Sequence, residues 1–114
     1  MANIAAVQIL KRRNDVKVYE WTPGTENDTY DSVEVPQRAD KTIQVSGDFG
    51  GGNVGVEGCL SQDADIWSVL HDPQGNDIAL TAAGVETILE NVVAIRPKVP
   101  TGAAVSVTIR ILMS

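Results

Sequence analysis

The chain has 114 residues, and nine basic against fifteen acidic residues give it a formal net charge of −6. This length suits one domain, 1–114, whose hydrophobic core needs no metal or disulfide support, and the single Cys59 cannot form a disulfide within the chain. The negative charge argues against nucleic acid and anionic membrane surfaces as partners.

Apolar residues at every second position predict β-strands from one end of the chain to the other. In chain order, the predicted strands cover residues 4–10, 15–21, 32–35, 41–47, 53–60, 66–70, 77–80, 92–96 and 104–113. The last of these alternates most regularly. Short strands separated by turn sequences are typical of an all-β fold, and we predict an antiparallel β-sandwich of jelly-roll type.

The first predicted strand could instead belong to an N-terminal arm, residues 1–10. Its apolar residues Ile4, Val7, Ile9 and Leu10 lie on both faces of a strand, which is more apolar surface than a one-sided sheet needs. We therefore expect a neighbouring subunit or another protein to cover part of it. The alternative is that this strand completes the core of the sandwich.

Residues 22–31 form the longest polar stretch and are predicted to be a loop. Trp21 lies at the edge of this loop with Tyr19 on the same strand face, and Tyr30 lies near its other end. An exposed aromatic pair of this kind can stack on a sugar ring or fill a pocket in a protein partner.

Turn residues and one ambiguous segment organise the second half of the chain. Trp67 is in phase with Val69 and is predicted to be buried between the sheets. The sequence DPQGN at 72–76 predicts a tight hairpin turn, because proline pre-sets the first turn position and glycine accepts a positive φ. Residues 85–93 fit a helix as well as a pair of short strands, and we predict strands because a glycine precedes them.

The chain carries no catalytic motif. His71 is the only histidine, and no motif places a Ser or Cys beside it. Glu86 and Glu90 are expected to be a solvated edge and not a glycosidase pair, and the glycines at 50–52 are expected to form a turn, because no helix follows them to make a phosphate site.

Four aspartates near the predicted hairpin could supply oxygen ligands to Ca²⁺, but they lack the spacing of a calcium loop. They are Asp63, Asp65, Asp72 and Asp77. We therefore expect no enzyme activity, no catalytic residues, no cofactor and no metal site.

A central pattern of glycines, turns and one tryptophan resembles small proteins encoded among the head genes of tailed phages. It comprises VSGDFGGGNVGVEG at 45–58, DIWSVL at 65–70, DPQGN at 72–76, TAAG at 81–84 and IRP at 95–97. Within that group the chain is similar to the cement, or decoration, proteins of short-tailed bacteriophages. The resemblance implies a compact jelly-roll sandwich on the outer capsid that ties neighbouring major capsid subunits together, often as a homodimer, without catalytic residues.

The expected function is therefore that of a structural virion protein on the outer capsid surface, with the major capsid protein as its partner. The expected partner-binding residues are Ile4, Val7, Ile9, Leu10, Tyr19, Trp21 and Tyr30. The alternative is a carbohydrate-binding β-sandwich module, discoidin-like, on a phage particle. A concave aromatic groove would favour sugar, whereas burial against another subunit would favour assembly.

Overall fold

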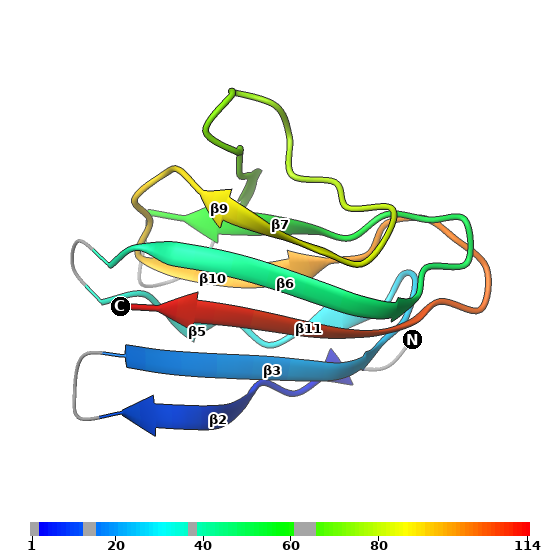
Figure 1. Cartoon of the computed structure of the whole chain (residues 1–114), viewed down its shortest axis with the longest axis horizontal. Helices are drawn as coiled ribbons and strands as arrows, with labels where there is room; N and C mark the ends of the chain where they lie inside the picture. The colour runs from blue at the N-terminus through cyan, green and yellow to red at the C-terminus, as the bar shows by residue number, and fades with distance from the viewer. Residues whose placement is uncertain (1–2, 13–15, 37–38, 61–65) are drawn as a thin grey trace.

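The structure is a computed structural model that describes residues 3–12, 16–36, 39–60 and 66–114, and these residues form eleven strands and no helix. The strands are β1 (Asn3–Ile4), β2 (Val7–Arg12), β3 (Val16–Gly24), β4 (Thr29–Tyr30), β5 (Val33–Glu34), β6 (Lys41–Asp48), β7 (Gly55–Cys59), β8 (Ser68–Val69), β9 (Gly84–Ile88), β10 (Ala94–Lys98) and β11 (Ser106–Met113). Nine of them form two antiparallel sheets packed against each other, with the larger sheet in front in Figure 1. The predicted all-β antiparallel sandwich is confirmed, while the jelly-roll topology stays a prediction.

The larger sheet has five strands in the order β2-β3-β11-β6-β9, and all neighbours are antiparallel. Its central strand, β11, has the regular alternation seen in the sequence. Ile109 pairs with Trp21 on β3 and with Val45 on β6, and all three side chains are buried. Every second residue of β11 therefore points into the sandwich, as alternation requires.

The smaller sheet has four strands in the order β5-β10-β7-β8, also antiparallel, and a parallel pair β1-β4 lies beside the sandwich core. Gly58 on β7 faces the core where space is tight. A Cβ added there would lie 2.7 Å from Cγ1 of Val92 and 2.9 Å from Cδ2 of Leu70. Glycine at this position lets the two large side chains close over the strand.

The core fills the space between the two sheets with apolar side chains from both. The fully buried residues of the core include Trp21, Ile43, Val45, Val54, Val56, Ile95, Val105, Val107, Ile109, Ile111 and Met113. Ile4 and Ala6 pack against this cluster from the N-terminal segment. Of the two alternatives for the first predicted strand, the one in which it completes the core therefore applies to Ile4.

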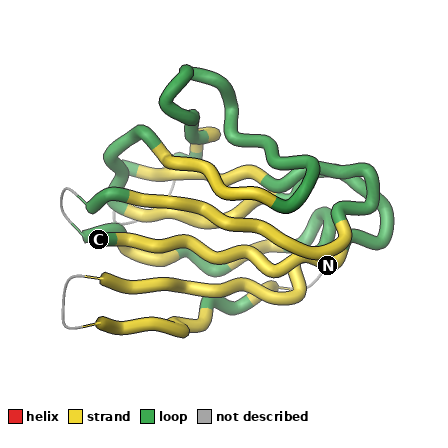
Figure 2. The backbone as a smooth tube through the Cα atoms, in the orientation of Figure 1, coloured by secondary structure: helices red, strands yellow, loops and turns green. Residues whose placement is uncertain are grey.

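Most predicted strands are present, some of them shorter than expected. The strand predicted at 77–80 is wrong: the chain there makes only isolated bridges, Asp77 with His71 and Leu80 with Val54. The loop predicted at 22–31 is also partly wrong, because its first residues extend β3 and its last form β4. The segment 85–93 contains β9 and no helix, so the choice of strand over helix is confirmed for its first part, while residues 89–93 belong to no strand and the predicted second strand is wrong (Figure 2).

The predicted environments of the two tryptophans are wrong. Trp21 is fully buried, and its Nε1 donates a hydrogen bond to the backbone oxygen of Asp31 at 2.9 Å. Trp67 is partly exposed, and the guanidinium carbon of Arg96 lies 4.1 Å from its ring centre. Trp67 does share a face with Val69, but Val69 pairs with Glu57, whose side chain lies on the outward face of the sheet.

Candidate functional site

Apolar side chains gather on the outward face of the five-stranded sheet. We call this surface the apolar face and define it by Val7, Ile9, Val18, Val85 and Leu112. Val7, Ile9 and Val85 are 57%, 44% and 57% exposed, values unusual for large apolar residues on the outside of a sheet. A groove of about 410 Å³ runs between β2 and β9 over this face.

The strand register explains why these residues meet. Leu112 on β11 pairs with Val18 on one side and with Thr42 on the other. Gln44, the next outward residue of β6, pairs with Val85 on β9. Side chains that are far apart in the sequence therefore stand side by side across all five strands.

Among the described residues, one ion pair crosses the apolar face. Nε of Arg110 donates to Oε2 of Glu20 at 2.8 Å, so the two charges neutralise each other. Thr42 and Gln44 supply the other polar atoms of the groove. The groove is locally neutral in a molecule of net charge −6, which favours contact with an apolar protein surface.

The residues expected to bind a partner are divided between the surface and the core. Val7 and Ile9 are exposed on the apolar face, Ile4 and Tyr19 are partly buried, and the side chain of Leu10 lies outside the described residues. Trp21 and Tyr30 are buried, so the expected exposure of these aromatics is wrong.

Tyr30 is tied into the fold by its phenol group. Its Oη donates to the backbone oxygen of Thr25 at 2.6 Å, and burial raises the pKa of Tyr30 to about 12. The rings of Trp21 and Tyr30 therefore serve as core residues.

Three residues of the apolar face were not among the expected site residues: Val18, Val85 and Leu112. A signal for Leu112 was present in the sequence, because it interrupts the alternation of the last strand with a second apolar residue next to Ile111. Val85 belonged to the ambiguous segment, whose face could be assigned only after its pairing with β6 was known.

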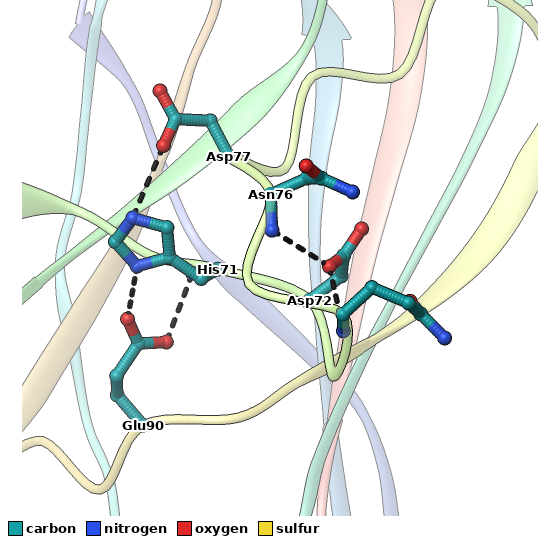
Figure 3. A network of polar contacts seen from close by, with 6 residues as sticks. His71, Asp72, Asn76, Asp77 and Glu90 are labelled. Atoms are coloured by element: carbon teal, nitrogen blue, oxygen red, sulfur yellow. Dashed lines mark hydrogen bonds and ion pairs between the residues drawn. The ribbon is translucent and has the colours of Figure 1, made fainter.

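A polar cluster surrounds His71 at the end of the β8 hairpin (Figure 3). The ring Nδ1 contacts Oε2 of Glu90, and the ring Nε2 lies 3.1 Å from Oδ1 of Asp77. The backbone N–H of His71 donates to Oε1 of Glu90 at 2.9 Å, and the N–H of Leu89 donates to the backbone oxygen of His71 at 3.1 Å. We call this set of contacts the histidine clamp, since it ties the 72–76 turn to the chain that leaves β9.

The carboxylates determine the protonation of the clamp. The hydrogen bond to Glu90, followed by the charges of Glu90, Asp77 and Asp72, raises the pKa of His71 in spite of partial burial. Burial alone would raise the pKa of Glu90, but the hydrogen bonds from the ring and backbone of His71 outweigh it and lower that pKa. The two groups therefore favour their charged forms together.

Both ring nitrogens of His71 are already engaged by carboxylates, so neither is available as a general base or a metal ligand in this arrangement. Asp72 is likewise used within the predicted turn, where its Oδ1 accepts from the N–H groups of Gln74 and Asn76 at 3.0 Å each. Among the described residues no group of His, Cys, Asp and Glu is arranged to hold a metal. Asp63 and Asp65 lie outside the described residues.

Another polar cluster lies on the outward face of the four-stranded sheet. We call it the charged ladder and define it by Glu57, Trp67, Arg96 and Lys98. Glu57 pairs with Arg96 in the β7-β10 register; Nε of Arg96 donates to its Oε1 at 3.1 Å, and Nζ of Lys98 donates to its Oε2 at 3.4 Å. The Glu57 side chain is only 12% exposed, so one nearly buried carboxylate holds two cations.

Comparison of this chain with protein-family models, with curated proteins and with solved structures gives no match. Within the described ranges, no helix has the length and apolar character needed to cross a membrane. The function therefore has to be argued from the three surfaces above: the apolar face, the histidine clamp and the charged ladder.

Proposed function

We propose that this protein is a structural component of a bacteriophage particle that binds the outer capsid surface and stabilises the shell by bridging major capsid subunits. The observation that carries the proposal is the apolar face, on which Val7, Ile9 and Val85 are about half exposed and Ile9 and Val85 line one groove. Exposed apolar residues gathered on one face mark protein contacts more often than single scattered ones do. The phage context comes from the resemblance of the sequence patterns at 45–58 and 65–76 to small proteins encoded among the head genes of tailed phages.

Such a role requires no strong single interface. A shell offers many identical sites, so weak contacts made by many copies add up to a large stabilisation of the lattice. The edge strands β2 and β9 border the apolar face, and edge strands carry backbone groups that can pair with another chain. We propose a homodimer or an edge contact with the capsid at one of these strands.

The carbohydrate-binding alternative has less support. It rested on an exposed aromatic platform, and Trp21 and Tyr30 are core residues. Trp67 is on the surface, but Arg96 lies over its ring. A glycan would have to displace this guanidinium to stack on that side of the ring.

Co-sedimentation with capsids tests the proposal. The double variant Ile9→Asn, Val85→Asn removes apolar contacts from the apolar face and adds no charge, and we expect it to pellet poorly with capsids assembled from the phage's own major capsid protein. The control is Leu60→Asn, Leu89→Asn, because Leu60 and Leu89 are apolar residues at least as exposed (77% and 58%) that do not line this groove.

The control variant should co-sediment as the unmodified chain does. If the apolar-face variant is folded and still pellets in full with capsids, the apolar face is not the binding surface. If the unmodified chain pellets with no capsid at all, the proposed function itself is wrong.

A further inference from the structure

We propose that Arg96 and Lys98 form a binding site for a carboxylate group of a protein partner on the outward face of the four-stranded sheet. The site follows from the geometry of the charged ladder alone. Only the identity of the partner, the capsid surface, rests on the proposed function.

Arg96 is held in place before any ligand arrives. Its guanidinium carbon lies 4.1 Å from the ring centre of Trp67, and its Nε is fixed by Glu57 at 3.1 Å. Stacking on an aromatic ring and one charge-assisted hydrogen bond restrict the rotamers of a long side chain. A ligand therefore meets a guanidinium whose orientation is already set.

The outer edge of this guanidinium remains available. Nε is the only nitrogen of Arg96 that contacts Glu57, and the two terminal nitrogens donate to no acceptor within the described part of the chain. These terminal N–H groups form the fork that binds a carboxylate through two parallel hydrogen bonds. The side chain of Arg96 is 35% exposed, so the fork can be reached from solvent.

Lys98 adds a second cation that Glu57 matches only in part. Its Nζ shares Glu57 with Arg96, at 3.4 Å, and its side chain is 45% exposed. The ladder thus has two positive charges and one negative charge, although the whole molecule is acidic. An incoming carboxylate would complete the pairing of the second cation.

The hollow beside the ladder limits which anion fits. It measures about 200 Å³ and is lined by Asp28, Thr29, Tyr30, Glu57, Arg96, Pro97 and Lys98. A planar carboxylate matches the two parallel N–H groups of the guanidinium fork. The site therefore suits a single carboxylate, such as that of an Asp or Glu side chain.

The position of the ladder suits a bridging protein. The apolar face belongs to the outward side of the five-stranded sheet, and the charged ladder belongs to the outward side of the four-stranded sheet. A protein that ties two neighbouring subunits together needs two separate contact surfaces. These two faces, on opposite sides of the sandwich, supply one apolar and one charged contact.

Titration with sodium acetate at constant ionic strength tests the site directly, with the side-chain Nε–H signals of Arg96 and Arg110 followed by NMR. Arg110 is the internal reference, because it is paired with Glu20 on the other sheet and is similarly exposed, at 48%. We expect a saturable shift at Arg96 and no saturable shift at Arg110. An equal response at both arginines, or a response that does not saturate at Arg96, would overturn the proposal.

Two substitutions sharpen the test. Arg96→Lys keeps the charge but removes the fork, so we expect acetate to bind about tenfold more weakly, whereas Arg110→Lys leaves binding unchanged. For Arg96→Lys, binding is then followed at the amide signals of residues 96–98. Unchanged acetate binding by a folded Arg96→Lys chain would contradict the site.

Capsid binding separates this proposal from the proposed function. Weaker co-sedimentation of Arg96→Lys than of the unmodified chain supports the ladder as a capsid contact, and equal co-sedimentation refutes that assignment. Saturable acetate binding by a chain that pellets with no capsid would uphold the carboxylate site and refute the capsid role.

Discussion

The outward faces of the two sheets carry different chemistry, although the same in-and-out alternation builds both. On the five-stranded sheet the outward positions include Val18, Val85 and Leu112, and a single ion pair crosses them. On the four-stranded sheet the outward positions of β7 and β10 hold Glu57, Arg96 and Lys98. The larger sheet thus leaves apolar groups exposed, whereas the smaller sheet satisfies its outward groups by cross-strand ion pairs.

This difference predicts which substitutions change the stability of the fold. The charged ladder and the histidine clamp connect neighbouring segments within the chain, so changes there should alter folding. The side chains of the apolar face are largely accessible to solvent, so they contribute little to the stability of the fold. Changes there should instead alter contacts with other proteins. Substitutions ranked by their expected effect can test this division.

The largest effect is expected for Trp21, which lies in the core, and it is compared with that of Trp67, which lies on the surface. Trp21→Ala removes a fully buried side chain and should cost about 3–5 kcal/mol in the free energy of unfolding. Trp67→Ala removes a partly exposed ring and its contact with Arg96, and should cost about 1 kcal/mol or less. Denaturant unfolding followed by circular dichroism measures both, and equal midpoints for the two variants would contradict their placement.

A smaller effect is expected within the charged ladder. Glu57→Gln leaves Arg96 and Lys98 without their shared carboxylate and should destabilise the fold by about 1 kcal/mol, because the Glu57 side chain is mostly buried. The corresponding change on the other sheet, Glu20→Gln, affects a more exposed pair and should cost less. Urea unfolding at low and high salt compares the two, and a larger loss for Glu20→Gln would reverse the comparison.

The histidine clamp should make the β8 end of the smaller sheet sensitive to pH. Since the carboxylates raise the pKa of His71, its contribution to stability is present below the ordinary histidine pKa and is lost as pH rises through the raised value. The lowered pKa of Glu90 gives the acid limit: its contribution is lost as pH falls through that lowered value. NMR titration of His71 should show its pKa fall in Glu90→Gln, and an unchanged pKa would contradict the clamp.

Hydrogen exchange locates the same effect in the fold. The amide of Leu89, bonded to the backbone oxygen of His71, should lose protection above the His71 pKa after correction for intrinsic rates. The amides of β11 in the larger sheet serve as the reference. Equal loss of protection in both places would indicate general loosening and not release of the clamp.

The smallest effect on folding is expected on the apolar face. Ile9→Asn with Val85→Asn replaces side chains that are about half exposed, and the free energy of unfolding should change by about 1 kcal/mol or less. Self-association should fall at the same time, as sedimentation velocity at high protein concentration would show. A large loss of stability would mean that this face belongs to the core of the fold.

Local patterns in the sequence predicted most of the strands, because alternation and turn residues act over a few positions. The turn at 72–76 forms with Gly75 at a φ of +88°, and the last strand alternates as expected. Such patterns show that two residues share a face, as Trp67 and Val69 do, but not whether that face is inward. Which face of β8 points inward depends on its pairing with β7, and the sequence of neither strand alone predicts this pairing.

Contacts between distant residues explain what the sequence could not predict at the candidate sites. Glu90 reaches His71 from nineteen positions away, and Glu57 reaches Arg96 across thirty-nine. Lys41 is unexpected for another reason, since this charged residue takes an inward position on the same strand face as Ile43 and Val45 and is 2% exposed. Burial lowers the pKa of Lys41, whose Nζ donates to the backbone oxygen of Ala39 at 3.2 Å.

The central place of β11 has a consequence for the rate of folding. In the larger sheet β11 lies between β3 and β6, which do not pair with each other. Ile109 on β11, for example, pairs with Trp21 on β3. The chain must therefore close a loop of more than eighty residues before β3 and β6 are connected, which costs entropy before it gains contacts. Folding should accordingly be slow for a protein of this size, on the scale of about milliseconds to seconds.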